Sequence, residues 1–174
     1  VGDVADVSRI FANTNAAAAG GAITALILSQ IVYKKVDLTM VLNGALAGLV
    51  SITAEPLTPG LGVATLIGGF GGVIVVFAVP ILDKFKIDDV VGAIPVHLFA
   101  GIWGTLAVVI TNPDATLMAQ LAGIVVIGLF TFIVSLTVWM ILSKSIGIRV
   151  SEEAEMAGLD NSELGMDSYP EFSR

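Results

Sequence analysis

LMAQLAGIVVIGLFTFIVSLTVWMILS, residues 117–143, contains no charged side chain. An α-helix rises about 1.5 Å per residue, so a helix over this run would reach roughly 40 Å and cross the ~30 Å hydrocarbon core of a bilayer. Lipid offers backbone N–H and C=O groups no hydrogen-bond partner, so a spanning segment of this length must be a helix. The run therefore predicts a transmembrane helix.

Four further apolar runs precede this one, at residues 12–33, 40–54, 62–82 and 93–110. Polar loops with charges, prolines or both separate them, at residues 34–39, 55–60, 83–89 and 111–114. The run at 40–54 is short, and its helix either takes in Asp37-Leu38-Thr39 or breaks at Glu55-Pro56. Only 13% of the residues are charged, about half the share of a soluble domain. The fold class is therefore an all-α polytopic membrane protein.

The basic residues set the expected orientation. With five crossings, seven of the eight basic residues lie on one side, in the loops 34–39 and 83–92 and from residue 144 onward, whereas Arg9 lies on the other. This positive-inside asymmetry places the C-terminus in the cytoplasm. The expected domains are an extracytoplasmic loop at 1–11, a transmembrane domain at 12–144 and a cytoplasmic tail at 145–174. The first residue is not Met, and the natural protein is expected to extend further toward the N-terminus.

Small residues recur at the spacing of helix contacts. Gly44 and Gly48 form G-x-x-x-G in the second run, Gly68 and Gly72 do so in the third, and residues 16–21 of the first run are all alanine or glycine. Such faces allow helix backbones to approach closely in lipid. We expect a compact bundle, although this pattern carries no information on what the bundle transports.

His97 is the single histidine and lies in the fourth run. Ionisable groups at membrane depth are costly and usually face a pathway or a bundle interior. At α-helical spacing its neighbours are small residues: Ala93, Ala100, Gly101 and Gly104. His97 is therefore either the lining of a narrow pore or a buried histidine bonded to a neighbouring helix. A neutral imidazole could bond a small polar molecule in a dry passage, since it has one donor and one acceptor nitrogen.

Other polar residues have open roles. Asp88 and Asp89 begin the same helix, where carboxylates complement the helix dipole, and a structural role is favoured. Glu55 either attracts cations at the outer face or is an ordinary solvated loop acid. Asn43 either caps its helix or bonds across helices. Trp103 and Trp139 are expected to be packing or interface aromatics.

Several function classes are excluded or disfavoured. There is no cysteine, no second histidine and no phosphate-binding G-x-x-x-x-G-K-[ST] loop, so we expect no enzyme, no cofactor and no metal site. Seven of the 15 acidic residues lie in the last 30 positions, and this acidic tail argues against nucleic acid as a partner.

Three stretches of the chain are distinctive together: residues 41–54, VLNGALAGLVSITA; residues 86–104, KIDDVVGAIPVHLFAGIWG; and residues 145–169, SIGIRVSEEAEMAGLDNSELGMDSY. They resemble the Amt/Mep/Rh ammonium transporters. The first resembles a signature helix of that family, the second its KxDDPVGAxxVHGxCGxWG helix, and the third its tail, GLRVxxExExxGLDxxxHGExAY. The chain would supply the last five of eleven helices, which are built as inverted repeats, plus the tail.

The resemblance implies transport of ammonium or ammonia, with methylammonium as a possible analogue, across the cell inner (plasma) membrane. Ammonium would lose its proton at an outer vestibule, and ammonia would pass through a hydrophobic pore in each subunit of a homotrimer. His97 would be the second of two pore histidines, Ala93, Thr53 and Gly101 would line or border the path, and Asp89 would be structurally important. The tail would carry regulation, and a PII signalling protein could bind at the cytoplasmic face. Its signature residues are Arg149, Glu152, Glu153, Gly158, Leu159, Asp160 and Tyr169.

This chain departs from the family pattern at several positions. Val90 replaces a proline, Leu98 a small residue, and Leu164 a tail histidine. A solvated acidic tail without a regulatory role stays open. An ammonium sensor with the same fold is the alternative function, and a general channel for water or gas ranks below both.

Overall fold

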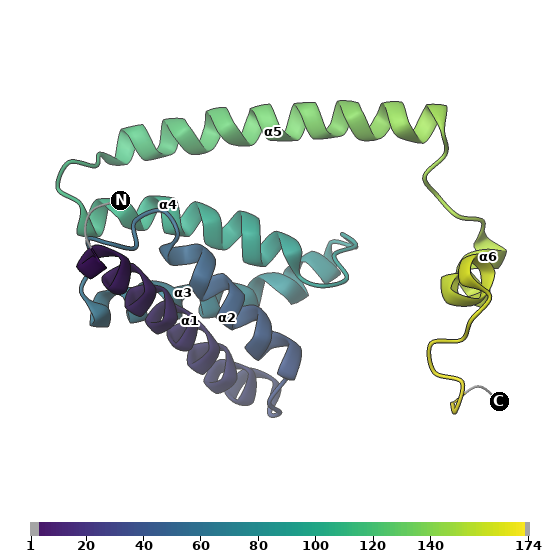
Figure 1. The fold of residues 1–174 in the computed structure, drawn as a ribbon, viewed down its shortest axis with the longest axis horizontal. Helices are drawn as coiled ribbons and strands as arrows, with labels where there is room; N and C mark the ends of the chain where they lie inside the picture. Colours follow the sequence, from purple (N-terminus) through teal and green to yellow (C-terminus); the bar gives the residue numbers. More distant parts are fainter. Residues whose placement is uncertain (1–3, 173–174) are drawn as a thin grey trace. The chain divides into compact units, whose positions relative to one another are not determined.

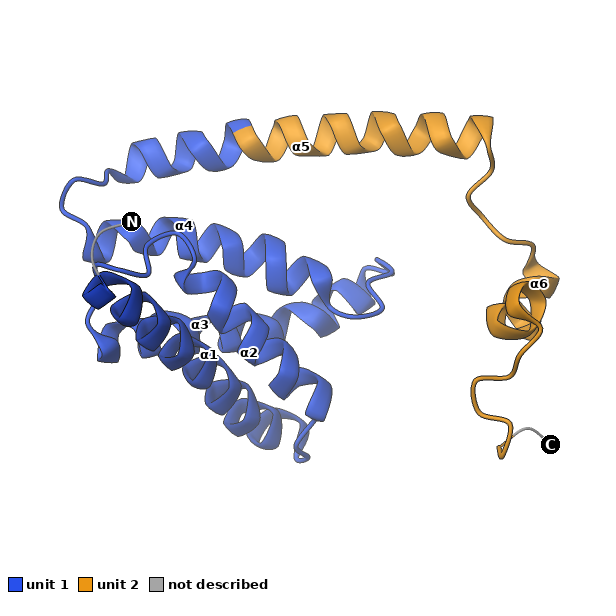
Figure 2. Cartoon of the chain, in the orientation of Figure 1, with its two compact units in different colours: residues 1–126 blue, residues 127–174 orange. Residues whose placement is uncertain are grey.

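The computed structural model describes residues 4–172, and this part of the chain is helical, without a β-strand (Figure 1). The described residues form two compact units, one up to Val126 and one from Ile127 (Figure 2). The elements are α1 (Val4–Tyr33), α2 (Leu38–Ile52), α3 (Leu61–Lys84), the π-helical turn η1 (Ile94–Phe99), α4 (Ala100–Thr111), α5 (Leu117–Ser145), α6 (Glu152–Ala157) and the π-helical turn η2 (Asp160–Leu164).

Each of the five expected spans coincides with a helix. Four are long and apolar enough to cross a membrane: α1, α3, the continuous helix Ile94–Thr111, and α5. The fifth, α2, has 15 residues and rises only about 22 Å. It begins directly after Asp37, whose carboxylate accepts a hydrogen bond from the backbone N–H of Met40 at 3.0 Å. The polytopic helical fold is confirmed, and the short second span begins nearer Asp37 than residue 40.

The expected loop at residues 1–11 is wrong where the structure describes it. Residues 4–11 are the first turns of α1, which begins at Val4. This stretch has no proline or glycine to interrupt a helix, and the Ser8 hydroxyl donates to the Val4 carbonyl at 2.9 Å. Residues 1–3 of that loop and residues 173–174 of the tail lie outside the described residues.

Small residues bring α1, α2 and α3 into backbone contact. A Cβ atom on Gly21 would lie 2.1 Å from the carbonyl oxygen of Gly44 in α2, and one on Gly72 would lie 2.3 Å from that of Gly21. A Cβ on Gly48 would meet the Ala17 carbonyl at 2.3 Å. The close packing predicted from the small-residue faces is thus confirmed, because no larger side chain fits at these crossings.

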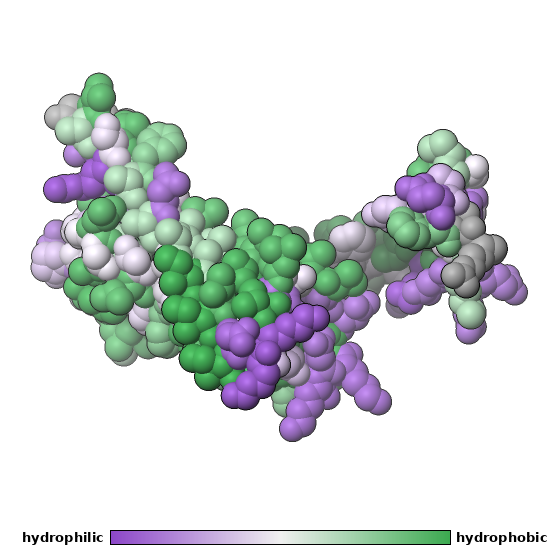
Figure 3. All heavy atoms as spheres, turned by 90° about the horizontal axis from the view of Figure 1, so that it is seen from below, coloured by the Kyte–Doolittle hydropathy of each residue, from purple (hydrophilic) through white to green (hydrophobic). Residues whose placement is uncertain are grey.

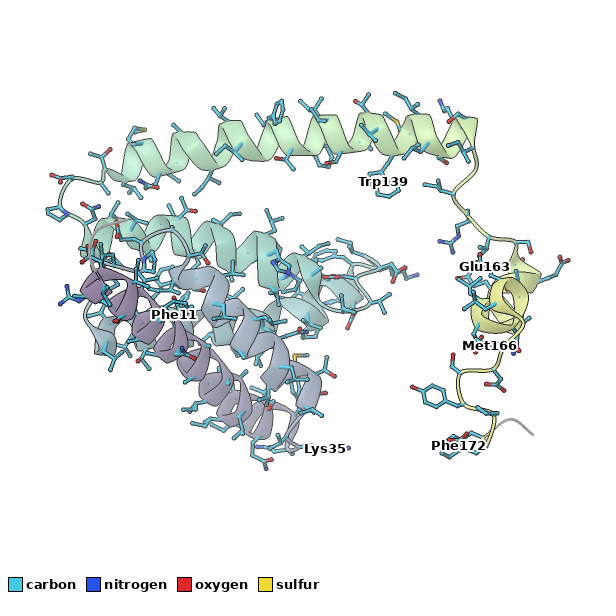
Figure 4. The ribbon with its side chains drawn as sticks, viewed as in Figure 1. Phe11, Lys35, Trp139, Glu163, Met166 and Phe172 are labelled. Carbon is cyan, nitrogen blue, oxygen red and sulfur yellow. The ribbon has the colours of Figure 1, made fainter. Side chains whose placement is uncertain are left out.

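Buried polar side chains tie the loops to the bundle. The Asn13 side chain, 2% exposed, donates to the carbonyls of Pro56 and Pro59, both at 2.8 Å. It thereby holds the α2–α3 loop over the beginning of α1. The opposite end of this unit carries the α1–α2 turn with Lys35 (Figure 4) and the loop after α3. Figure 3 shows a broad hydrophobic area bordered by hydrophilic residues.

The second unit contains most of α5 and the tail. No charged residue occurs in α5 before Lys144. Beyond it, α6 begins after Ser151, whose hydroxyl oxygen accepts a hydrogen bond from the Ala154 N–H at 3.2 Å. The tail is therefore folded locally at α6 and η2.

Candidate functional site

The helix that carries His97 has a well-bonded beginning. One carboxylate oxygen of Asp89 accepts from the backbone N–H of Ala93 and the other from that of Ile94, both at 2.8 Å. This satisfies two of the N–H groups that a helix start leaves without partners. Asp88, the other member of the acidic pair, is exposed. Of the two aspartates, Asp89 is therefore the one that bonds the beginning of the helix.

His97 lies in a π-helical turn, not in a regular α-helix. The turn spans Ile94–Phe99, and the N–H of Ala100 bonds back to the carbonyl of Pro95, five residues earlier. One extra residue per turn rotates everything that follows by about 100° relative to a continuous α-helix. Such insertions are rare and frequently occur at functional sites. Apart from Pro95, no residue in this stretch indicates such a turn.

The four small residues expected beside His97 do not all lie on its face of the helix. His97 and Ala93 are exposed, and Gly101 is half-buried. Ala100, at 0% exposure, and Gly104 face the neighbouring helices instead. A Cβ on Gly104 would lie 2.6 Å from the Ser51 carbonyl oxygen in α2. The expectation that all four small residues share the histidine face is wrong, because the α-helical spacing on which it rested does not apply.

His97 has no hydrogen-bond or ionic partner among residues 4–172, so the buried, bonded histidine is not what this part of the chain shows. Leu98 beside it is 51% exposed. Thr53, also expected on the path, is exposed and directly follows α2; its hydroxyl donates to the Leu49 carbonyl at 2.7 Å. The structure thus leaves His97 on an open, largely apolar face, with Thr53 near the opposite end of the bundle from Ala93.

Trp103 packs one and a half turns beyond His97. Its indole N–H donates to the Ile67 carbonyl in α3 at 3.0 Å, and its ring centroid lies 4.4 Å from that of Phe70. This agrees with the expected packing role. The other tryptophan, Trp139 on α5, is 58% exposed (Figure 4).

Glu55 is not an isolated loop acid. Its carboxylate accepts a hydrogen bond from the Asn112 side chain at 3.1 Å, which joins the α2–α3 loop to the end of α4. The hydroxyl of Thr58 is the main cause that lowers the pKa of Glu55, and the Asn112 amide adds to it, against a smaller opposing effect of burial. Glu55 is thus a bonded anion that fastens the loop 55–60.

A cavity of about 230 Å³ lies at the end of the first unit where η1 begins. Its lining includes Asn43 together with three carboxylates, Asp83, Asp88 and Asp89. Sequence reasoning did not single out Asp83. Within residues 4–172 no three His, Cys, Asp or Glu side chains are placed to hold a metal ion.

The tail residues form small local contacts. Arg149 pairs with Glu155 at 3.2 Å, and both side chains are more than half exposed, so the pair contributes little stability. Asp160 Oδ2 accepts from the backbone N–H of Ser168 at 2.9 Å. That bond is the main cause that lowers the pKa of Asp160. The remaining predicted tail positions are placed as follows: Glu152 and Glu153 in the first turn of α6, Gly158 after it with φ +92°, Leu159 next, and Tyr169 with its ring near Phe172.

Comparisons with known proteins agree along the chain. The model of the Ammonium Transporter Family matches residues 2–169. The ammonium transporter Amt2 of Archaeoglobus fulgidus is 39% identical, covering 95% of this chain and 40% of that protein. Amt1 of Haloferax mediterranei is 38% identical, covering 97% and 34%. This chain therefore spans about two fifths or less of the length of these curated relatives.

Two solved structures resemble the fold. A structure described as a sensor Amt protein matches with a TM-score of 0.85 at 30% identity, over 93% of this chain and 43% of its own. The crystal structure of Candida albicans Mep2 matches with a TM-score of 0.75 at 25% identity, over 94% and 41%.

Proposed function

Because this chain belongs to the Ammonium Transporter Family, we propose that the complete protein moves ammonium or ammonia across a membrane and that His97 lines its path. The observation that carries the proposal is the place of His97: it is exposed, without a partner among residues 4–172, and lies in a π-turn of an apolar, membrane-length helix. Placing an ionisable group at membrane depth without a partner costs free energy, so a functional role is expected for it.

The chemistry of imidazole suits the cargo. Ammonia can donate and accept hydrogen bonds, and a neutral imidazole offers one nitrogen of each kind. His97 would therefore hand on ammonia, while a proton removed at the outer vestibule takes a linked route. Ala93 and Gly101 would border the same passage, and Thr53 would lie nearer its outer end.

The open face around His97 supports a passage that is closed by the rest of the protein. This chain spans 40% of the Archaeoglobus fulgidus relative, so other helices are available to cover the face. We place the C-terminus in the cytoplasm, since Lys34, Lys35, Lys84 and Lys86 lie at the end of the bundle from which η1 begins. A homotrimer in the plasma membrane, and a PII protein or a neighbouring subunit that contacts the acidic tail, belong to the same proposal.

An ammonium sensor is the second candidate. The favouring observation is the similarity to a sensor Amt protein, with a TM-score of 0.85. A sensor would keep the fold and bind the cation, but it would couple binding to a signal instead of to transfer.

The test is uptake of radiolabelled methylammonium by cells that express the complete coding sequence. His97→Ala should abolish uptake while the protein still folds and assembles. Ile110→Ala is the matched control, because Ile110 is 64% exposed on the same helix and should leave uptake unchanged. Equal uptake by wild type and His97→Ala would contradict the proposed path. A folded wild-type protein that binds ammonium without uptake would favour the sensor.

A further inference from the structure

Two backbone carbonyls of the first unit accept a hydrogen bond from a side chain of another helix. One belongs to Val76 in α3, four residues before Pro80. Proline inside a helix has no backbone N–H, so the carbonyl four residues earlier loses its helical donor. The other belongs to Val91, in the turn that precedes η1.

In α3, a side chain from another helix supplies the missing donor. The Tyr33 hydroxyl, at the end of α1, donates to the Val76 carbonyl. A bare carbonyl in an apolar bundle costs free energy, because neither water nor the helix satisfies it. Tyr33 therefore compensates for the N–H that Pro80 lacks.

A side chain also bonds the backbone directly before the helix that carries His97. The side-chain amide of Asn43 donates to the Val91 carbonyl at 2.9 Å. Asn43 is 8% exposed and belongs to α2. Val91 lies outside the helix, so its carbonyl has no helical N–H to accept from. The amide thus fixes the turn that leads into η1.

The local backbone is built around this amide. Gly92 has φ +75°, a conformation that side chains rarely adopt. A Cβ there would lie 2.8 Å from Nδ2 of Asn43, so the glycine also leaves the amide its space. Asp89 bonds the N–H groups of Ala93 and Ile94 on the other side of the turn. Together these three residues account for the donors and acceptors that precede the π-turn.

From this arrangement we infer that Asn43 is a positioning residue for His97. His97 follows Pro95 by two residues, so the orientation of its ring depends on how the first turn of the helix is held. The Asn43 amide holds the Val91 carbonyl directly before the helix begins, and it thereby sets where the π-turn begins and which way His97 points. The transport consequence rests on the role proposed above for His97, whereas the positioning itself does not.

Asn43→Leu in the purified complete protein tests the inference, because leucine keeps the approximate volume and removes the donor. Amide hydrogen exchange in residues 93–100 should become roughly tenfold faster, as expected when a buried acceptor is left unsatisfied. Uptake per folded protein should fall, and its pH profile should shift. Asn43→Asp, which keeps the shape but cannot donate, should have the same effects and serves if the leucine variant does not fold.

A matched control separates this local effect from a general loss of stability. Tyr33→Phe also removes a side-chain donor from a backbone carbonyl, that of Val76 in α3. In Tyr33→Phe, exchange should rise near Val76 and stay at the wild-type rate in residues 93–100, with no change in the pH profile of uptake.

Wild-type exchange in residues 93–100 for both Asn43 variants, or an equal acceleration there in Tyr33→Phe, would overturn the inference. If the wild-type protein itself shows no uptake, the proposed function fails, and the exchange data still decide whether Asn43 positions the turn.

Discussion

Gly68 of α3 and Ala17 of α1 touch backbone to backbone: a Cβ atom on Gly68 would lie 2.1 Å from the Ala17 carbonyl oxygen. Ala17 itself is fully buried. A side chain at residue 68 would therefore force α1 and α3 apart along their whole contact, because two helix backbones cannot yield locally.

Gly68→Leu should prevent folding, since overpacking typically costs about 1–3 kcal/mol and here the obstacle is backbone. The measurement is the yield of monodisperse protein in size-exclusion chromatography. Gly62→Ala, in the same helix with nothing within 4 Å of its added Cβ, is the control and should elute as wild type. A normal elution profile for Gly68→Leu would contradict the packing described.

Asn13→Ala should loosen the α2–α3 loop. The variant leaves the carbonyls of Pro56 and Pro59 without their donor, at a cost of about 2 kcal/mol. Thermal unfolding in detergent should therefore show a lower midpoint. Asn15→Ala is the matched control, because the exposed Asn15 amide donates only to the Phe11 carbonyl of its own helix. Equal unfolding midpoints for Asn13→Ala and Asn15→Ala would contradict a stabilising role of the Asn13 bonds to the loop.

Glu55 should make the stability of the loop 55–60 depend on acidity. Its pKa is lowered from the ordinary value of 4.5 by bonds to the ionised carboxylate. The ionised form is therefore favoured in the folded protein, and this stabilisation is complete above pH 4.5 and lost as the pH falls through the lowered pKa. Hydrogen exchange of residues 55–60 should accelerate on acidification in the wild type. Glu55→Gln should show a much weaker pH dependence over the same range.

Asp160 should have a similar effect in the tail. The Ser168 N–H lowers its pKa below the ordinary 3.8, so the segment 160–168 is held above that pH and released as the pH falls through the lowered pKa. Asp160→Asn should expose the Ser168 amide to exchange already at neutral pH. Glu163→Gln, an exposed acid in the same turn, is the control and should leave that amide protected.

The helices could be predicted because charge and apolar length are local properties of the sequence. Residues 117–143 have no charge at all, and α5 covers them. The G-x-x-x-G pairs likewise predicted the contacts of Gly44 and Gly48, since a small residue at a fixed spacing has little other use in lipid. Both features can be recognised in the sequence without knowing which helices are neighbours.

The surroundings of His97 could not be predicted in the same way. The π-turn at Ile94–Phe99 directly follows the backbone that Asn43 bonds at Val91, and that bond joins residues 48 positions apart in the chain. Sequence spacing assumed a regular helix and so placed Ala100 and Gly104 on the wrong face. The sequence also left open whether Asn43 caps its own helix or bonds to another helix, because either role needs only an amide near a helix end.

The order of donors and acceptors in the chain has a consequence for biogenesis. Tyr33 and Asn43 are synthesised before the carbonyls of Val76 and Val91 that they bond. A polypeptide that enters the bilayer from its N-terminus thus has each donor in place before the segment with its acceptor arrives. Neither carbonyl has to wait for a donor that is still on the ribosome.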